Sequence, residues 1–280
     1  MKEVAVSNWE EFEESVKGLH EGRRSRLESG GPVPSHFLFR GQENSSWNLS
    51  TTLERAGYER MWYRHYFELI SRIHPEIQSC GFGRWSIRIP PDFEKSLSFD
   101  TINSGHTPNQ EEYSYMVFLR HHGFPSPLLD WTRSEYVAAF FAFRKANSDS
   151  VAIYVYQETP EGFHASGTDR PFIKVLGHYV ETIRRHFLQQ CEYTVCLNWA
   201  NQLHFARHEE VFAPPTTQPY RNSVFQQDAL WKFVLPAAER IKVLRRLEAH
   251  NLNGFSLFGT AESLMDTLAL RELMLQKQQQ

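Results

Sequence analysis

The sequence predicts an α+β fold. Segments with strand character alternate with segments of helical periodicity along the 280 residues, without the regular repeat of a parallel βαβ sheet. Hydrophobic residues make up 41% of the chain, enough for a sizeable core. We see no internal repeat and no long linker. We therefore expect an N-terminal helical extension over residues 1–30 and a single domain over residues 31–280.

Helices are predicted where apolar residues recur three or four positions apart. Ser7 or Asn8 is the expected N-cap of the first helix. Gly123 is expected to end the helix that begins at residue 111, and Ser134 to start the helix that follows it. The predicted helical ranges are 8–30, 53–78, 111–122, 134–143, 178–188, 236–250 and 261–275. Residues 80–108 carry several glycines, prolines and serines and are predicted to form an irregular insertion.

Strands are predicted in short runs of β-branched and aromatic residues. The predicted ranges are 36–39, 128–131, 150–157, 193–196, 229–235 and 255–258. We expect the first of these to end at Gly41. Residues 150–157 are apolar on both faces, which is typical of a central strand.

Composition excludes several classes of site. The formal net charge of −3 does not indicate a nucleic-acid partner, although a local basic stripe remains compatible with it. Cys80, Cys191 and Cys196 form no CxxC pair, and His204 and His208 lack a third ligand, so we expect neither a disulfide framework nor a metal. The chain shows no secretory signal, and its longest apolar run, residues 136–143, is too short for a bilayer. We expect a cytoplasmic protein with no membrane partner.

Three distant segments place polar groups beside strongly apolar runs. They are Phe-Leu-Phe-Arg-Gly-Gln at 37–42, Leu-Leu-Asp-Trp-Thr-Arg-Ser at 128–134 and Gln-Gln-Cys-Glu-Tyr-Thr at 189–194. Polar groups held against buried elements are costly unless something satisfies them. An arginine, a hydroxyl pair and a Gln-x-Glu on three such elements are suited to binding a charged nucleotide.

These segments resemble a known family. The Phe-Arg-Gly tripeptide at 39–41 and the run His-His-Gly-Phe-Pro-Ser-Pro-Leu-Leu-Asp-Trp-Thr at 121–132 resemble the two signatures of the FRG domain. Residues 189–194 resemble its later Gln-Gln-Gly-x-Phe-Thr element, with Cys191 at the glycine position, and Ser126 stands where threonine is more usual. The resemblance extends over about residues 35–270, through the closing segment at 231–258.

The same segments resemble the Arg–Ser–Glu layout of NAD-dependent ADP-ribosyltransferases, with Arg40, Thr132-Arg133-Ser134 and Gln190-Cys191-Glu192 in order. This resemblance implies a split β-sheet core with surrounding helices, and NAD as substrate without a metal. Within it, Arg40 would pair with the pyrophosphate and Gly41 would let the backbone approach the ligand.

The resemblance also assigns roles to the remaining candidates. Glu192 would stabilise the oxocarbenium-like cation that forms as nicotinamide leaves, and Gln190 would position the acceptor from the same strand face. Together with Arg40, these are the candidate catalytic residues. Gln42, Thr132 and Ser134 would complete the cofactor-binding set, and His121 with Tyr113 or Tyr115 would line the nicotinamide pocket.

Structural roles compete with these assignments. Arg40 is also suited to an ion pair with Asp130, and Asp130 to capping the helix that follows it. Thr132 or Ser134 is a candidate N-cap, a role that is compatible with ligand binding. Glu192 fits an ordinary exposed strand position, because glutamate is mostly found exposed.

The function implied is transfer of ADP-ribose from NAD to a protein or RNA acceptor, or hydrolysis of NAD. A bacterial toxin or phage-defence effector with an antitoxin or chaperone partner fits that activity. An RNA acceptor would need basic side chains around the cleft, for which the candidates are Arg133, Lys174, Arg184 and Arg185. The alternative is a non-catalytic nucleotide-sensing or protein-binding FRG module. A metal-dependent hydrolase is disfavoured by the lack of a dense acidic and histidine cluster in the sequence.

Overall fold

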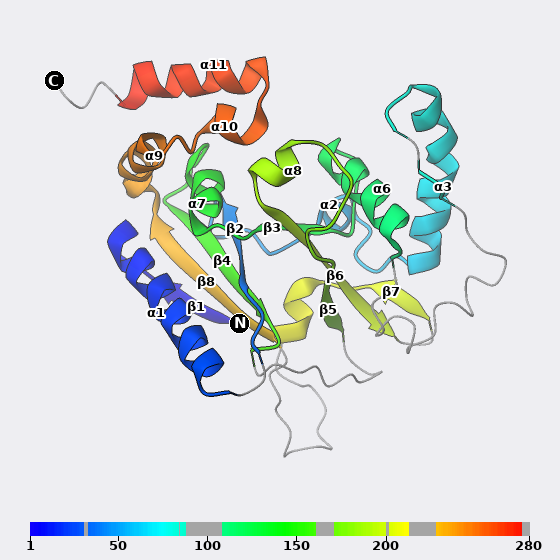
Figure 1. Ribbon diagram of the computed structural model, residues 1–280, viewed down its shortest axis with the longest axis horizontal. Helices are drawn as coiled ribbons and strands as arrows, with labels where there is room; N and C mark the ends of the chain where they lie inside the picture. Colours follow the sequence, from blue (N-terminus) through cyan, green and yellow to red (C-terminus); the bar gives the residue numbers. More distant parts are fainter. Residues whose placement is uncertain are drawn as a thin grey trace.

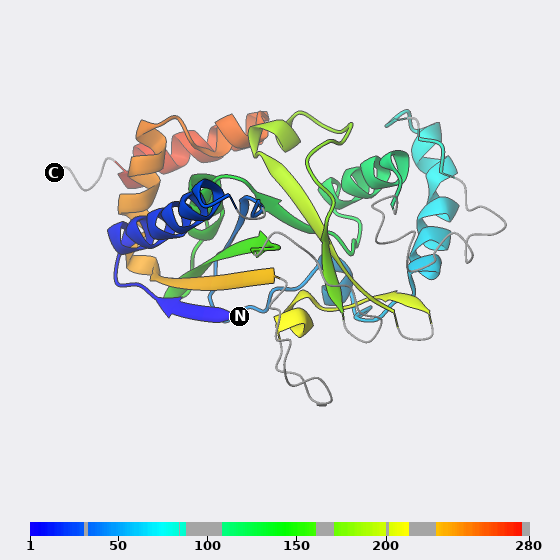
Figure 2. The ribbon, with the colours of Figure 1, turned by 60° about the horizontal axis from the view of Figure 1, so that its bottom comes forward.

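A mixed β-sheet runs through the centre of the molecule, with helices against its faces (Figures 1 and 2). The structure is a computed structural model that describes residues 1–30, 33–83, 85–87, 108–160, 171–199, 202–212 and 228–275. The predicted α+β class is confirmed. No helix in these ranges combines the length and the apolar character needed to cross a bilayer.

The strands of the described ranges form one sheet in the order β1-β8-β4-β2-β3-β6-β5, with β7 paired to β6. Their bounds are β1 Lys2–Ala5, β2 Phe37–Gln42, β3 Leu129–Thr132, β4 Ser150–Glu158, β5 Phe172–Val175, β6 Cys191–Trp199, β7 Leu203–Phe205 and β8 Asp228–Pro236. Strand β4 lies between β2 and β8, which confirms the central strand predicted from its two apolar faces.

The helices lie around this sheet. Their bounds are α1 Trp9–Glu28, α2 Thr52–Arg55, α3 Tyr63–Ser79, α6 Gln110–His121, α7 Glu135–Phe143, α8 Arg185–Leu188, α9 Arg240–Ala249, α10 Gly254–Phe258 and α11 Ala261–Leu270. Further helical turns are η1 His208–Phe212, η2 Ala237–Glu239 and η3 Arg271–Leu275.

The sheet diverges between β2 and β3. Strand β2 pairs with β4 along its whole length of 6 residues, and β3 pairs with β6 along its whole length of 4. Between β2 and β3, however, the register contains one pair, Phe39 with Thr132. Beyond that pair the second half of β2 and the first half of β3 separate, and this separation makes room for a site.

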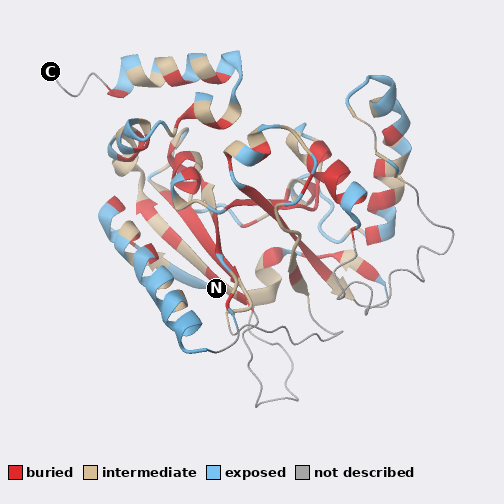
Figure 3. Cartoon of the chain, in the orientation of Figure 1, coloured by how far each residue is buried: buried red, intermediate tan, exposed pale blue. Residues whose placement is uncertain are grey.

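Burial is concentrated on the sheet and on the inward faces of the helices (Figure 3). One apolar cluster joins α1, α7 and α9 to one face of β2, β4 and β8. A second joins α3 and α6 to β6 and β7, and a third covers the opposite face of β2, β3 and β4. Alternate residues of each strand therefore belong to different clusters, as the two-residue period of a strand requires.

Residues 1–30 contribute a strand as well as the predicted helix. Strand β1 pairs in parallel with β8, with Lys2 opposite Trp231. In α1, Trp9 and Phe12 are fully buried, and Asn8 is the N-cap that accepts a hydrogen bond from the backbone N–H of Glu11. The helix was expected from its periodicity. The strand was not, because its four residues are mostly exposed and show no apolar run.

Several predicted bounds were wrong for local reasons. The predicted strand over residues 255–258 is the helix α10, whose N-cap is Asn253 and whose C-cap, Gly259, has a φ of 68°. The predicted helix over 178–188 is helical only in α8. The predicted helix over 53–78 is split into α2 and α3. Most of the predicted insertion at 80–108 lies outside the described residues.

Gly41 is required by packing against α7 rather than by the end of a strand. Strand β2 continues through Gly41 to Gln42, although we expected it to end there. A Cβ atom on Gly41 would lie 1.9 Å from the carbonyl oxygen of Ala138 and 2.6 Å from the backbone nitrogen of Ala142. Both are backbone atoms of α7, so neither can move aside without displacing the helix.

We expect Gly41→Ala to lower the free energy of unfolding by about 1–3 kcal/mol or more, because it overpacks the contact between β2 and α7. Urea unfolding followed by circular dichroism measures this. Gly22→Ala is the matched control, since Gly22 lies in α1 with nothing within 4 Å of the added Cβ. The control should gain up to about 1 kcal/mol from helix propensity. Equal stability of the two variants would contradict the packing argument.

Candidate functional site

A cavity of about 750 Å³ opens where β2 and β3 diverge. Its size is within the range of small-molecule and cofactor sites. The cavity is lined by Phe39, Arg40, Gly41, Gln42, Glu43, Ser46, Trp47, Asn48, Ser50, Arg55, Asp130, Trp131, Thr132, Ala138, Phe141, Gln189 and Cys191. Residues from β2, the following loop, β3, α7 and the start of β6 therefore meet at one hollow.

The predicted site residues divide between this cavity and its surroundings. Arg40, Gly41, Gln42 and Thr132, four of the residues predicted to bind the cofactor, are among its lining residues. The other predicted residues, His121, Ser134, Gln190 and Glu192, are not among the lining residues.

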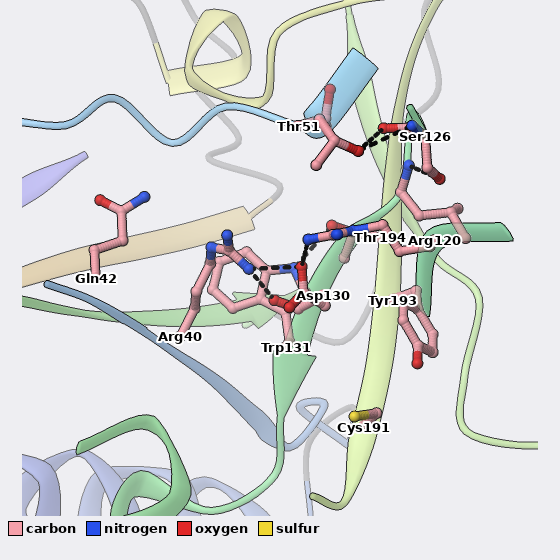
Figure 4. A network of polar contacts seen from close by, with 12 residues as sticks. Arg40, Gln42, Thr51, Arg120, Ser126, Asp130, Trp131, Cys191, Tyr193 and Thr194 are labelled. Atoms are coloured by element: carbon pink, nitrogen blue, oxygen red, sulfur yellow. Dashed lines mark hydrogen bonds and ion pairs between the residues drawn. The ribbon is translucent and has the colours of Figure 1, made fainter. Parts of the chain in front are cut away.

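Asp130 is held between two arginines (Figure 4). Arg40 Nη1 donates to Asp130 Oδ1 at 2.8 Å and to the Asp130 backbone carbonyl at 2.7 Å. Arg120 Nη2 donates to the same Oδ1 at 2.6 Å. The ion pair between Arg40 and Asp130 that the sequence offered as an alternative is therefore present. The expected capping of α7 by Asp130 was wrong, because Ser134 occupies the N-cap.

The charges around Asp130 affect one another. Burial alone would raise the pKa of the Asp130 carboxyl, but Arg120 and Arg40 hold it well below its usual value. Burial lowers the pKa of the Arg55 guanidinium, and Arg40 and Arg120 lower it further. Arg40, Arg120 and Arg55 thus lie around Asp130, with Glu54 as a further carboxylate that acts on Arg55, and this end of the cavity favours an anion. Glu43 is the other carboxylate among the lining residues.

Two polar atoms of lining residues have no hydrogen-bond partner within the described residues. These atoms are Arg40 Nε, a donor on a cation, and Gln42 Oε1, an acceptor. The Gln42 side chain is otherwise anchored, because its Nε2 donates to the Asn48 carbonyl at 3.2 Å. Unsatisfied buried polar groups are uncommon and costly, so this pair favours a ligand that presents both an anionic acceptor and a hydrogen-bond donor.

Aromatic side chains form part of the cavity wall. Trp131 is fixed, since its Nε1 donates to Thr194 Oγ1 at 2.8 Å and its ring lies 5.4 Å from that of Tyr156. Trp47, by contrast, is 51% exposed on the loop after β2. A fixed ring and an exposed ring in one cavity provide surfaces on which a planar group can stack.

The hydroxyl pair is already engaged in holding the backbone. Thr132 Oγ1 donates to the Gln189 carbonyl at 2.7 Å and accepts from the Ser134 N–H at 3.1 Å. Ser134 Oγ accepts from the Val137 N–H at 3.3 Å as the N-cap of α7. The N-cap role expected for one of the two is therefore confirmed for Ser134. Thr132 connects the end of β3 to the residue before the turn into β6.

Glu192 lies on the far side of β3 from Arg40. It pairs in register with Trp131 and has a side chain only 1% exposed, so the exposed strand position considered for it was wrong. Its Oε1 lies 3.0 Å from His36 Nε2, 3.5 Å from His178 Nδ1 and 3.7 Å from Arg133 Nε. These three side chains are partly exposed and cover the buried carboxylate.

Gln190 does not share a strand face with Glu192, so that prediction was wrong. Strand β6 begins at Cys191, and Gln190 precedes it in the left-handed region with a φ of 49°. Its carbonyl accepts from the Arg133 N–H at 3.1 Å. Gln190 therefore forms an exposed turn, and Gln189 is the glutamine that reaches the cavity.

His121, Tyr113 and Tyr115 are not among the lining residues, and each is hydrogen-bonded elsewhere. Tyr113 donates to the Gly177 carbonyl at 2.5 Å, and Tyr115 donates to the Ile70 carbonyl at 3.1 Å. His121 Nε2 lies 2.7 Å from the Tyr193 hydroxyl. Burial, with help from Arg185, lowers the pKa of His121 to about 3. His121 is thus a neutral imidazole at physiological pH.

Comparison with known proteins gives a family match for one part of the chain. The model of the FRG domain family matches residues 35–150. This range includes both β2 with Arg40 and β3 with Asp130, whereas residues 189–194 lie beyond it. Searches of the curated proteins and of the solved structures find no match.

We expect Asp130→Asn to lower the free energy of unfolding by about 2 kcal/mol, because two guanidinium groups lose their charged partner. Urea unfolding at pH 7 measures this, with the exposed Asp149→Asn as control.

The pH dependence provides a second measurement. Because the pKa of Asp130 is depressed in the folded protein, its stabilisation is present above about pH 4, the ordinary aspartate value, and is lost as the pH falls below it. The stability difference between wild type and Asp130→Asn should therefore shrink towards pH 2 or so. A difference that is constant with pH would exclude this role of the ion pair.

Proposed function

We propose that the cavity binds a nucleotide, with NAD as the candidate, and that the protein transfers ADP-ribose from NAD to a macromolecular acceptor, either RNA or protein. The observation that carries this proposal is the composition of the cavity: a surplus of guanidinium groups around Asp130, two unpartnered polar atoms and two tryptophan rings. A nucleotide presents the matching anion, hydrogen-bond donors and planar base.

The diverging strands support the placement of the ligand. With its pyrophosphate at Arg40 and Arg55, a dinucleotide would extend along the cavity. Its other end would lie near Thr132, Gln189 and Cys191, which line the cavity at the end of β3 and at the start of β6. Guanidinium groups bind phosphate oxygens in a bidentate manner, and Arg40 has one nitrogen committed to Asp130 with its Nε unpartnered. The divergence of β2 and β3 is also compatible with the split sheet that an ADP-ribosyltransferase-like core requires.

Glu192 is the candidate catalytic carboxylate. It directly follows Cys191, the lining residue at the start of β6. In the reaction, the bond between the ribose C1′ and nicotinamide breaks with its electron pair going to nicotinamide. The acceptor nucleophile then bonds to C1′ and loses its proton. A buried carboxylate beside this centre would stabilise the ribosyl cation and accept that proton, with His36 and His178 in contact with it.

The second candidate is a non-catalytic nucleotide-sensing module. Its support is that Glu192 is not among the lining residues. Strand β3 separates its strand from that of Arg40, and the carboxylate is already in contact with three side chains. Both candidates require nucleotide binding in the cavity, and they differ in whether nicotinamide is released. A toxin or phage-defence role, with an antitoxin or chaperone, belongs to the first candidate.

We expect NAD to bind the wild-type protein and Arg55→Gln to weaken that binding by about 10-fold or more, since a hydrogen-bonded charge pair with phosphate is lost. Isothermal titration calorimetry measures this. Arg60→Gln is the control, because Arg60 is exposed and pairs with Glu210 outside the cavity. Arg40 is a poorer choice, since its removal also unpairs Asp130. Equal affinity of the Arg55 and Arg60 variants would refute the assigned cavity.

We expect the wild-type protein, given NAD labelled in its adenylate part, to transfer the labelled ADP-ribose onto material in a cell extract and to release nicotinamide. Glu192→Gln should lower both by about 100-fold or more while leaving NAD binding nearly unchanged. The exposed Glu181→Gln is the control. Ribonuclease or protease treatment of the labelled product identifies the acceptor. Binding without nicotinamide release would favour the sensor, and undiminished release by Glu192→Gln would disprove the role of Glu192.

A further inference from the structure

Two histidines meet a cysteine that lines the cavity. His121 is the last residue of α6, His186 lies in α8, and Cys191 begins β6. Their ligand-capable atoms all lie within 4.8 Å of one another. We propose that His121, His186 and Cys191 bind one Zn²⁺ ion.

The donor set defines the metal. Two imidazole nitrogens and a thiolate sulfur are preferred by zinc, whereas magnesium and calcium prefer oxygen ligands. Tetrahedral zinc with bonds of about 2.0–2.3 Å places its ligand atoms roughly 3.5 Å apart. The three side chains therefore need to close inwards by about 1 Å around the ion. On binding, Cys191 releases its thiol proton to solvent and ligates as the thiolate.

The second contact of His186 prepares it for this role. Its Nε2 lies 3.1 Å from the His178 carbonyl oxygen, which can only accept a hydrogen bond. Nε2 therefore carries the proton, and Nδ1 turns its lone pair towards the cluster. A ligating histidine whose other ring nitrogen donates to a backbone carbonyl is a common arrangement in metal sites.

Tyr193 supplies the nearest further donor. Its hydroxyl oxygen lies 2.7 Å from His121 Nε2 and 3.3 Å from His186 Nδ1. Three protein ligands leave a fourth tetrahedral position, and this oxygen is beside it. Without an ion, the hydroxyl can donate to one imidazole and accept from the other. With zinc bound, both nitrogens would present their lone pairs to the ion.

The site has an entrance and a structural consequence. Cys191 lines the cavity, which gives the ion a route to the sulfur. A bound ion would tie α6 and α8 to β6, and it would thereby fix the turn at Gln190 beside Glu192.

The guanidinium of Arg185, which donates to the His121 carbonyl, repels a dication bound nearby. The Cys191 thiolate offsets part of that repulsion.

We expect chelator-treated, fully reduced protein to bind one Zn²⁺ per chain by isothermal titration calorimetry, and Zn²⁺ to raise its unfolding temperature. Substitution with Co²⁺ should give the near-ultraviolet charge-transfer absorption of a cobalt–thiolate bond. Cys191→Ser should remove that absorption and weaken Zn²⁺ binding by about 100-fold or more, and His186→Gln should weaken it by at least about 10-fold.

Cys196→Ser and Cys80→Ser are the controls. Cys196 is buried on the same strand and contacts the Arg207 carbonyl, and Cys80 is exposed. Both variants should keep the cobalt absorption. Lack of stoichiometric Zn²⁺ binding by the wild type, or lack of the cobalt–thiolate band, would overturn the site. So would a band that persists in Cys191→Ser or disappears in Cys80→Ser. If Cys191→Ser does not fold, the Zn²⁺ affinity of His186→Gln and the cobalt spectrum of the wild type test the site instead.

Discussion

The ion-paired cluster of Arg40, Asp130 and Arg120 holds the cavity together. Its three members come from β2, β3 and α6, which the backbone pairing alone would not keep in place, since β2 and β3 share a single register pair. A charge inside a protein is tolerated when it is paired and hydrogen-bonded. The cluster therefore fixes the distance between the two diverging strands. Arg40, together with Arg55, also makes the cavity between them attractive to an anion.

The fold class and most elements could be predicted from local patterns. The Ser134 N-cap and the central strand β4 were visible because capping residues and two-faced apolar runs act over a few residues. Helix α10 was mistaken for a strand because five residues are too few to display a helical period, and the Asn253 cap with its Ser256 partner was overlooked. The 178–184 segment is not helical, as the Gly177 and His178 carbonyls accept from side chains instead.

The candidate site was predictable in part. Arg40 and Thr132 were found because each sits in a recognisable motif on a strand that lines the cavity. Arg55 and Arg120 were missed, since nothing in the sequence relates them to Asp130 before the chain folds. The cluster of His121, His186 and Cys191 was missed for the same reason. His121 lies on α6, far along the chain from the other two residues, so the sequence shows no metal-ligand spacing. Residues that only the folded topology brings together cannot be recognised from a spacing or a period in the sequence.

Strand β1 places a constraint on when the protein can acquire its final form. Its partner is β8, and the first helix bonds to a residue 230 positions further along, through the Trp9 N–H and the Glu239 carboxylate. Such non-local pairing raises the contact order and slows folding, because a very long loop must close first. During synthesis on the ribosome, β8 has not yet been translated when β1 emerges. Strand β1 must therefore wait, unpaired, until β8 has been translated.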